Sequence, residues 1–578
     1  MDNRASKEEE AIGIEIKGDP LVDTAPQAEE EEYSNILERK NMTKREFNWL
    51  WAGVLIQALC SSFEACLNQG IISVVANYFG VTSLTAVLPT ILAVLATALV
   101  PFYTKVADVF GRAGSLTYAF TSYLVGLTIE ASAQSFLHLA IGQIFYGMGV
   151  TGIQALSQVV IADTTSLLHR GIMFAMYDMG NVANIWVAQA LIDPVTLGGA
   201  EDKWRIGYIA MVCIAAAGAL ALLIPLWYVQ LSLERRKVGQ VPRRSLRWLA
   251  NEFDFPGAIL ILLALSLTLL PLVLARRVAN NWQSPSIIAM FCSGLVFFVV
   301  LFVWESKFAK RPIMSIKIWT NRTAFGCLMI MFLLKVFGNV VWQYLTQYFV
   351  VSRDLTFGQS YLLVRGFQMA WLVFQLIAAL IMRRYKKARL MVWIGLIVYI
   401  IGVGLMIPAR NQDASVFLVV ISQTIAGAGG GMAHLASSVL VTGVVHKKDL
   451  ATVVGASQIM VSLGSAVGNA LAGGIWTQYL PSRLRIHVTG PYDMDRAMND
   501  QLKYVKFLDP VTKQQVINAY SDSQWFMSVM GLAVAALTIV CAAMLTHVDL
   551  EQDQDAQDRI ALGEKVPEVE DEKVDPKN

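Results

Sequence analysis

Between two long apolar runs, residues 105–112 read K-V-A-D-V-F-G-R and form a short polar segment. Asp108 and Arg112 are four residues apart, so on one turn of helix they would share a face and could pair. Gly111 permits a sharp turn or the close approach of another segment. The pattern is typical of a cytoplasmic latch, in which ion pairs hold two moving helices in one state. It is equally typical of a solvated turn that only separates two helices.

The composition of the whole chain is that of a membrane protein. It has 578 residues, of which 55% are hydrophobic and only 16% are charged. A soluble protein of this length needs more charge to cover its surface. Apolar runs recur along the sequence at about 20 residues, the length that crosses a bilayer as a helix. The sequence therefore predicts an all-α polytopic protein in a lipid bilayer, and a net charge of +2 gives no indication of a nucleic-acid partner.

We count fourteen candidate transmembrane helices, arranged as six, two and six. With the N-terminus inside, the internal connections carry most of the Lys and Arg residues, as the positive-inside rule expects. The exception is Arg276-Arg277 in an external connection, so the orientation of the loop at 276–285 stays open. The segments lie near residues 47–70, 84–104, 114–133, 136–162, 171–192, 206–229, 255–275, 286–304, 323–349, 359–382, 389–408, 415–442, 451–476 and 525–546.

Composition also predicts how these segments are grouped. Acidic, hydrophilic ends predict disordered cytoplasmic tails, and the long polar connection before the last segment predicts an external loop. The predicted parts are a tail at 1–45, an N-terminal six-helix bundle at 46–230, a cytoplasmic loop plus two-helix insertion at 231–310, a C-terminal six-helix bundle at 311–547 with the external loop at 477–524, and a tail at 548–578.

An internal duplication links the fourth and twelfth segments. At one constant offset, Gln143 aligns with Gln423, Gly147 with Gly427, and Gly149 with Gly429. Two six-helix halves separated by two extra helices produce such an offset. Duplicated halves with a binding site at their interface are typical of secondary transporters. Glycine-rich helices also match by chance, so the repeat alone does not fix the fold.

No catalytic, metal-binding or nucleotide-binding motif is present in the sequence. The six cysteines all fall in apolar runs, the six histidines have no metal-ligand spacing, and no phosphate-binding glycine loop occurs. We therefore expect neither an enzyme nor a bound cofactor. A polytopic chain without an ATPase must use an ion gradient or act passively.

Ionisable residues inside apolar segments are the main functional candidates, because each costs several kcal/mol unless it is paired or hydrated. Glu64 and Asp178 are candidates for proton coupling, since a buried carboxyl can exchange a proton in each cycle. The alternative for Glu64 is a helix-end carboxylate facing external water. Lys335 could attract an anionic substrate or pair with a carboxylate of the other half, and Arg365 is similar. We expect Glu130 to be solvated at the outer end of its segment.

Polar and aromatic residues cluster in the same segments, and as a set they favour a roomy polar cavity. Taken singly, such residues more often form interhelical hydrogen bonds or lie at the membrane interface. The residues predicted to contact substrate are Tyr146, Tyr177, Asn181, Lys335, Gln343, Tyr344, Tyr348, Arg365, Gln368 and Trp371.

The segment K-V-A-D-V-F-G-R resembles the cytoplasmic signature loop of the major facilitator superfamily, with Asp108, Gly111 and Arg112 at matching places. The usual leading glycine is replaced by Tyr103 or Thr104, and the second basic residue after Arg112 is absent. More narrowly, the chain resembles the fungal siderophore–iron transporter family over about residues 47–550. The motifs are A-D-V-F-G-R, G-Q-I-F-Y-G-M-G-V-T-G at 142–152, A-D-T-T-S-L-L-H-R at 162–170 and W-R-I-G-Y at 204–208.

This resemblance implies the major facilitator fold and proton-coupled import of ferric siderophore complexes by alternating access. The membrane would be the plasma membrane or an endosomal or vacuolar one, and the iron would travel within the substrate. Asp108, Gly111, Arg112, Asp163 and Arg170 would form the cytoplasmic gate. The stretch A-Y-S-D-S-Q at 519–524 is similar to a tyrosine-containing segment of the family, which makes Tyr520 a candidate substrate contact.

Other functions remain compatible with the sequence. The family also includes glutathione and haem transporters, and a fourteen-helix drug/proton exchanger would use the same scaffold with the opposite flux. A nutrient sensor that binds substrate without transporting it is an alternative of another class, which the long acidic N-terminal tail permits.

Overall fold

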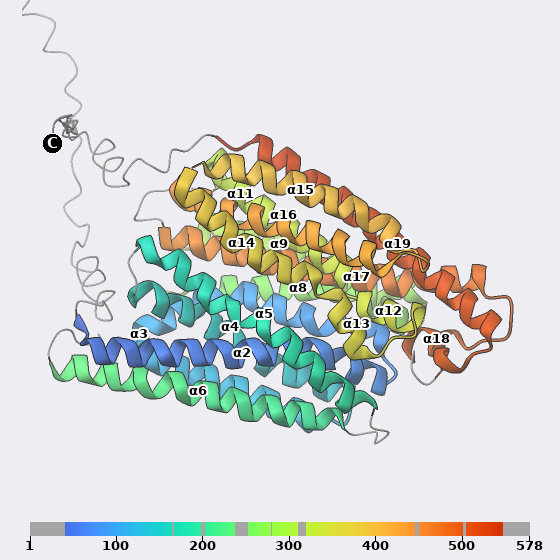
Figure 1. Ribbon diagram of the computed structural model, residues 1–578, viewed down its shortest axis with the longest axis horizontal. Coiled ribbons are helices and arrows are strands. Elements are labelled where there is room, and N and C mark those ends of the chain that lie inside the picture. The colour runs from blue at the N-terminus through green and yellow to red at the C-terminus, as the bar shows by residue number, and fades with distance from the viewer. Residues whose placement is uncertain are drawn as a thin grey trace, which may run out of the picture.

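The computed structural model describes residues 41–546 apart from 165–166, 198–202, 237–252, 279, 310–318, 386, 445–449 and 501–503. All regular secondary structure in these residues is helical, as predicted (Figure 1). The first group of helices is α2 (Lys44–Tyr78), α3 (Val87–Ala131), α4 (Phe136–Thr164), α5 (Leu167–Leu197) and α6 (Trp204–Arg235). Next come α8 (Phe255–Leu274) and α9 (Pro285–Val303). The last group is α11 (Arg322–Trp342), α12 (Leu345–Ser352), α13 (Phe357–Val364), α14 (Gly366–Tyr385), α15 (Ala388–Ala409), α16 (Val416–Gly443), α17 (Leu450–His487), α18 (Met494–Asn499) and α19 (Pro510–Ala543).

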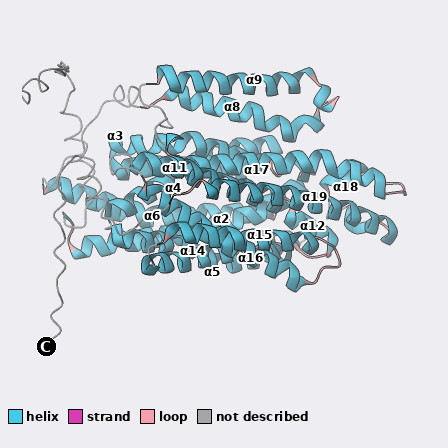
Figure 2. Ribbon diagram, turned by 90° about the horizontal axis from the view of Figure 1, so that it is seen from above, coloured by secondary structure: helices cyan, strands magenta, loops and turns pink. Residues whose placement is uncertain are grey.

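The long helices lie roughly side by side in two groups, which we call the N-terminal half (α2–α6) and the C-terminal half (α11–α19) (Figure 1). Each half has its own apolar core. The hairpin of α8 and α9 lies beside the two halves (Figure 2). Its inner helix packs through Ile261 and Leu265 against alanines of α3 and α17, including Ala98 and Ala466. The hairpin therefore covers one side of the junction between the halves.

Twelve helical segments of the described residues are long and apolar enough to cross a membrane. This confirms a multi-pass, all-α membrane protein. The prediction of fourteen spans exceeds this number by two, because α5 and the part of α3 after Gly111 are not among the twelve. The predicted tail at 548–578 and most of the tail at 1–45 lie outside the described residues.

The polar segment at 105–112 marks a sharp break inside α3. Gly111 has a φ of 73° and a ψ of 167°, while the residues on both sides are helical. Arg112, which follows the break, pairs with Asp163 of α4, while the side chain of Asp108, its predicted partner, lies outside the described residues. The positive φ at position 111 requires glycine, whereas the nearest atom to a Cβ there, Nε2 of Gln230 at 2.8 Å, is the end of a flexible side chain.

The predicted loop at 477–524 is mostly helical. Helix α17 runs on to His487 and α19 already begins at Pro510, which leaves only 488–509 with α18 between them. In the extension of α17, Leu480 and Leu484 are fully buried while Ile486 is exposed, so the helix continues with one covered face. Hydropathy marks where an apolar segment ends, and this helix continues beyond that point.

The predicted duplication is visible in how the helices pack. A Cβ on Gly149 of α4 would clash with the backbone of Tyr123 in α3, and a Cβ on Gly429 of α16 would clash with the backbone of Tyr399 in α15. In each half a glycine thus permits direct contact between two helix backbones, opposite a tyrosine. The two aligned glycines of the sequence therefore occupy matching places.

The connection between α8 and α9 lies at the same end of the molecule as α18. Arg276 lies 3.7 Å from the Asp495 carboxylate, and Asn281 and Gln478 form hydrogen bonds of 3.1 Å with each other. The connection that contains α18 is predicted to be external, and we call this end the outer end. Arg276, one of the two arginines that broke the positive-inside pattern, thus has an acidic partner from the predicted external loop.

Candidate transport site between the two halves

Side chains from both halves meet at the middle of the molecule. Asp178 of α5 and Lys335 of α11 attract each other electrostatically, although no direct ion pair joins them. The Lys335 ammonium lies 5.0 Å from the centre of the Trp371 ring of α14, a cation–π distance. The structure therefore brings together an acid, a cation and an aromatic ring, all predicted site residues, from three helices of the two halves.

His434 of α16 extends this group. Its ring lies 5.3 Å from the Trp371 ring, and its two ring nitrogens are buried without a hydrogen-bond partner among the described residues. The pairing of His434 with Trp371 follows from the packing of α14 against α16, which the sequence does not show.

Polar residues of α5 connect this group to α2. The Tyr177 hydroxyl donates to Gln57 Oε1 at 3.3 Å, and Asn181 Nδ2 donates to the carbonyl of Asp178 at 3.2 Å. Both were predicted to contact substrate. They lie on the same helix as Asp178, one turn or less away, and are therefore placed to line the same region.

Arg365 joins the halves directly. Its Nη1 donates to Gln69 Oε1 of α2 at 2.5 Å and to Gln368 Oε1 at 2.8 Å, and its guanidinium lies 4.0 Å from the Tyr361 ring centre. The Tyr361 hydroxyl in turn donates to the carbonyl of Cys66. Arg365 and Gln368 thus form part of a contact between α2 and the segment α13–α14.

The described hydrogen bonds between the halves all use residues 66–83 of the N-terminal half. Besides those of Cys66 and Gln69, Gln347 donates to Ser73, and Tyr344 donates to the carbonyl of Ser83. Asn499 of α18 accepts from Thr82 through its carbonyl and from the backbone of Ser83 through its side chain. This part of α2 and the following turn η2 (Thr82–Leu84) lie toward the outer end, so the molecule is in a conformation closed at that end.

Three tyrosines predicted to contact substrate are components of this closed end. Tyr344 stacks on Trp476 with ring centres 4.5 Å apart, and its whole side chain is buried. The Tyr520 hydroxyl donates to the carbonyl of Ala497, and that of Tyr348 donates to the carbonyl of Arg410. Tyr520 belongs to α19 and not to a loop. Each of the three would need the outer end to open before it could touch a substrate. Gln343 lies one residue before Tyr344 and is half-buried.

The two acidic residues of the first and third predicted segments lie inside the N-terminal half. Glu64 is fully buried, and its Oε2 accepts hydrogen bonds from Tyr123 at 2.7 Å and Tyr146 at 3.3 Å. The alternative of a carboxylate facing external water is therefore wrong. Tyr146 lies in this core next to Glu64. The solvated position expected for Glu130 is also wrong, because Glu130 is fully buried where Gly142 of α4 packs against it.

At the cytoplasmic end, Arg112 Nε lies 3.2 Å from Asp163 Oδ2, and both side chains are largely buried. This brings two of the predicted gate residues together within the N-terminal half. Gln230 of α6 accepts a hydrogen bond from the backbone of Ala113, directly after the break at Gly111. The side chains of Asp108 and Arg170 lie outside the described residues.

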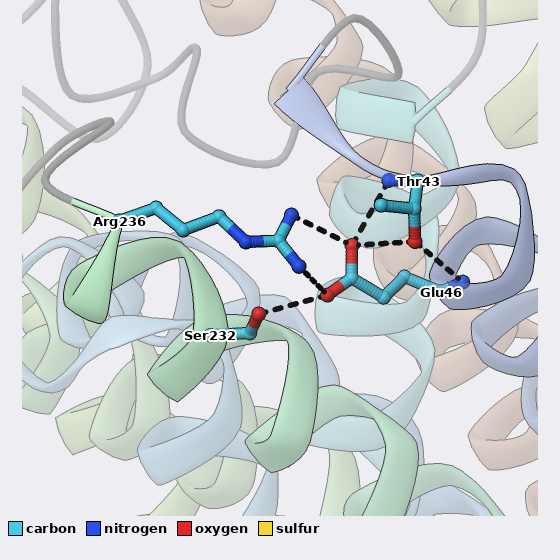
Figure 3. A network of polar contacts seen from close by, with 4 residues as sticks. All are labelled: Thr43, Glu46, Ser232 and Arg236. Atoms are coloured by element: carbon cyan, nitrogen blue, oxygen red, sulfur yellow. Dashed lines mark hydrogen bonds and ion pairs between the residues drawn. The ribbon is translucent and has the colours of Figure 1, made fainter.

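A second charged contact at this end was not predicted. Glu46 is 4% exposed and receives both terminal nitrogens of Arg236, at 2.7 and 3.2 Å, together with the Ser232 hydroxyl at 2.8 Å (Figure 3). The backbone and hydroxyl of Thr43 also donate to it. This network fixes the start of α2 to the end of α6. Thr43 and Glu46 have the spacing of a capping box, which predicts the helix start, but nothing in the sequence indicates the partner on α6.

The profile of a known family matches most of this fold. A family model described as Major Facilitator Superfamily covers residues 53–469. The chain belongs to the Major Facilitator Superfamily. This confirms the predicted family and shows a multi-pass membrane transporter, not an enzyme. The fold agrees, since a bacterial homologue of the human lysosomal transporter Spinster, crystallised inward-facing and unoccupied, superposes with a TM-score of 0.53 at 14% identity, covering 87% of this chain and 98% of that one.

Several curated relatives within the superfamily are fungal siderophore transporters. MFS siderochrome iron transporter C of Aspergillus fumigatus is 26% identical over 92% of this chain and 88% of its own length. The siderophore transporter fer7 of Mycosarcoma maydis is 28% identical over 82% of this chain and 76% of its own. The low affinity heme transporter str3 of Schizosaccharomyces pombe is 25% identical over 84% of this chain and 80% of its own. The narrower resemblance to siderophore–iron transporters is thereby confirmed.

Proposed function

We propose that this transporter imports ferric siderophore complexes in symport with protons, by alternating access between the two halves. The observation that carries the proposal is the group of Asp178, Lys335 and Trp371, which only the two halves together can form. Binding at the junction of duplicated halves is how secondary transporters couple substrate to a change in access. The similarity to siderophore transporters along nearly the whole chain supports this substrate class.

The chemistry of the group suits a large chelate. Lys335 offers a cation to anionic oxygens of a ferric complex, and Trp371 offers a flat apolar face. Amide side chains such as Asn181 and Gln368 can donate to or accept from the polar groups of a chelator. Because Lys335 is attracted by Asp178 without contacting it, an anionic substrate would compete with Asp178 for the same cation.

The cycle requires the outer contacts to break and re-form. In the closed conformation, hydrogen bonds of residues 66–83 hold the outer end shut, and substrate would leave the group toward the cytoplasmic side. Entry from outside would separate Tyr344, Tyr348 and Tyr520 from their partners. Glu64 would gain a proton while the outer end is open and release it inside, and the pair of Arg112 and Asp163 would stabilise the N-terminal half during the exchange.

The remaining parts of the proposal concern topology and place. We propose that α5 and the part of α3 after Gly111 also cross the membrane, which gives fourteen spans arranged as six, two and six with both tails in the cytoplasm. The membrane would be the plasma membrane, with an endosomal or vacuolar membrane as the alternative.

Uptake of radioactive iron tests the proposal. The chain is expressed in yeast that lacks its own carriers, and iron is presented as several defined ferric siderophores and as a free salt. We expect one chelate to accumulate, and a protonophore to abolish that accumulation. The variant Lys335→Gln should fail at equal surface expression, while the exposed-loop variant Asp413→Asn should be normal. Absence of uptake for every chelate would reject the substrate class.

Haem is the second candidate substrate. The similarity to a haem transporter favours it, and so does the buried imidazole of His434 beside Trp371, since an imidazole nitrogen can bind haem iron. Haem uptake that depends on His434, measured with His434→Gln, would replace the first proposal. Glutathione import and drug efflux are the next arms of the same assay. A sensor is distinguished by deleting residues 1–40, which would abolish signalling and spare transport.

A further inference from the structure

The N-terminal half contains a second buried carboxyl that no predicted role includes. Glu130 is fully buried, and neither of its carboxyl oxygens has a hydrogen-bond partner among the described residues. Glu64 is fully buried as well, and its Oε1 likewise has no partner there. A buried carboxylate without donors is strongly unfavourable, so the uncharged acid is the favoured form at such a site.

The groups near Glu130 favour its uncharged form further. Glu64 of α2 is the charge that acts on its carboxyl, and two negative charges in one apolar core repel each other. The hydroxyls of Tyr123 of α3 and Tyr146 of α4 donate to Glu64, and Tyr208 of α6 interacts electrostatically with both carboxyls. They supply polar groups but no positive charge.

Nearby cations have other contacts. Arg205 at the start of α6 donates to the carbonyl of Ala131, next to Glu130, and its guanidinium lies 4.4 Å from the Trp204 ring centre. His138 at the start of α4 is half-exposed and is not among the charges that act on Glu130. Among the described residues no cation forms an ion pair with either carboxyl, so protons are left to neutralise them.

The position of Glu130 along α3 indicates the direction in which a proton would move. It is the last residue but one of α3 and lies seven residues, about 10 Å, farther toward the outer end than Tyr123. Tyr123 donates to Glu64. Along α3, Glu130 therefore lies on the outer side of Tyr123, the residue that donates to Glu64.

We propose that Glu130 is the outer member of a two-carboxyl proton relay whose inner member is Glu64. A hydronium ion from the external side protonates the Glu130 carboxylate and leaves a water molecule. A tyrosine hydroxyl then gives its proton to Glu64 Oε2 and regains one that originates from Glu130, so one proton moves inward and no other bond changes. This deepens the proposed function and rests on its proton coupling, but it does not depend on which substrate is carried.

Transport assays of matched variants test the relay. We expect Glu130→Gln to lower protonophore-sensitive accumulation by roughly tenfold or more and to flatten its dependence on external pH. Substrate exchange across a membrane without a proton gradient should persist, because the substrate group is intact. Tyr123→Phe should give a smaller loss of the same kind. Tyr118→Phe, an exposed tyrosine of the same helix, and Asp413→Asn should behave as wild type.

A conservative variant distinguishes a role of Glu130 in packing from a role in proton transfer. Glu130→Asp keeps a carboxyl and should restore part of the pH dependence, whereas a merely structural role predicts that Gln, which is closer to Glu in size, is tolerated better than Asp. If Glu130→Gln accumulates substrate with an unchanged pH profile, the relay is wrong.

A spectroscopic readout needs no substrate. Infrared difference spectra of the purified full chain, recorded while pH is stepped, should show the carbonyl stretching band of a neutral buried carboxyl. The band should lose intensity in Glu130→Gln and in Glu64→Gln, and remain in Asp413→Asn. If the chain imports no siderophore but its infrared band changes as described, the proposed substrate is wrong and the relay stands. An unchanged band in Glu130→Gln would overturn the relay.

Discussion

The two halves of the molecule share one way of packing but bury different ionisable groups. In both, a glycine lets two helix backbones touch opposite a tyrosine, Gly149 with Tyr123 and Gly429 with Tyr399. The Tyr123 hydroxyl, however, donates to Glu64, while the Tyr399 hydroxyl has no partner among the described residues. The duplicated frame thus sets how the helices approach, and the side chains placed on it decide what each half can do.

The difference in charge extends over whole helices. The N-terminal half buries Glu64 and Glu130 and presents Asp178 toward the other half. The helices α11–α17 contain no Asp or Glu at all, and they contribute Lys335 to the same junction. One half is therefore suited to hold protons and the other to attract anions, and a proton gained on one side can weaken the attraction across the junction.

The largest effect is expected from breaking the charge contrast at the junction. Lys335→Gln should lower uptake by roughly 100-fold, the scale seen when a buried charge of a site is removed, because the substrate loses its cation and Asp178 loses its attraction. The exchanged variant Asp178→Lys with Lys335→Asp should recover the thermal stability of the wild type without recovering uptake. Uptake by the exchanged variant would show that the pair acts only on structure.

A smaller effect, on stability, is expected at the cytoplasmic end of the N-terminal half. Glu46→Ala removes the acceptor of Arg236 and Ser232 together with part of the α2 cap (Figure 3). We expect a loss of about 2–3 kcal/mol in the free energy of unfolding, since charged hydrogen bonds and a cap each contribute about 1 kcal/mol or more. Thermal unfolding in detergent measures it, and Glu46→Gln should retain part of the stability. A thermal unfolding midpoint of Glu46→Ala equal to that of the wild type would contradict the expected loss of stability.

The pair of Arg112 and Asp163 should couple by about 1–2 kcal/mol in a double-mutant cycle, because both side chains are largely buried. The control is Arg496 with Asp493, whose side chains are 68% and 52% exposed and 3.7 Å apart. Exposed pairs contribute about 0.5 kcal/mol or less. Equal coupling in the two cycles would remove the distinction between a gate contact and a surface contact.

The sequence predicted what depends on pattern along the chain and missed what depends on packing between helices. Apolar runs of helical length gave the all-α membrane fold, and K-V-A-D-V-F-G-R together with the aligned glycines indicated the superfamily before any coordinates. Glu130 was misplaced because its position near a helix end says nothing about α4 covering it. Tyr520 was assigned to a loop because hydropathy falls where an apolar segment ends, although α19 is helical there.

The same contrast between pattern along the chain and packing between helices holds for the site. Lys335 and Asp178 stood out because ionisable residues are rare in apolar helices, and each charge does act on the other across the junction. Tyr344 and Tyr348 share their polar-aromatic pattern with Tyr177 and Trp371, but they are fully buried in the closed outer end. Which polar residues line a pathway depends on the conformation, and the proposed alternating access requires at least two conformations of the same chain.

The smallest effect is expected from loosening the contact between the halves at the outer end. Asn499→Ala removes the side-chain acceptor of the Ser83 backbone, one hydrogen bond worth about 1 kcal/mol, which changes the population of the open state about fivefold.

The reactivity of Cys66 measures the population of the open state, because its side chain is 2% exposed at the contact between α2 and Tyr361. In a variant that keeps Cys66 as its only cysteine, a membrane-impermeant maleimide should label Asn499→Ala about fivefold faster from outside. The control Asn411→Ala, an exposed residue at the same end, should leave the rate unchanged. A rate unaffected by Asn499→Ala would mean that α18 follows the closure of the outer end and does not stabilise it.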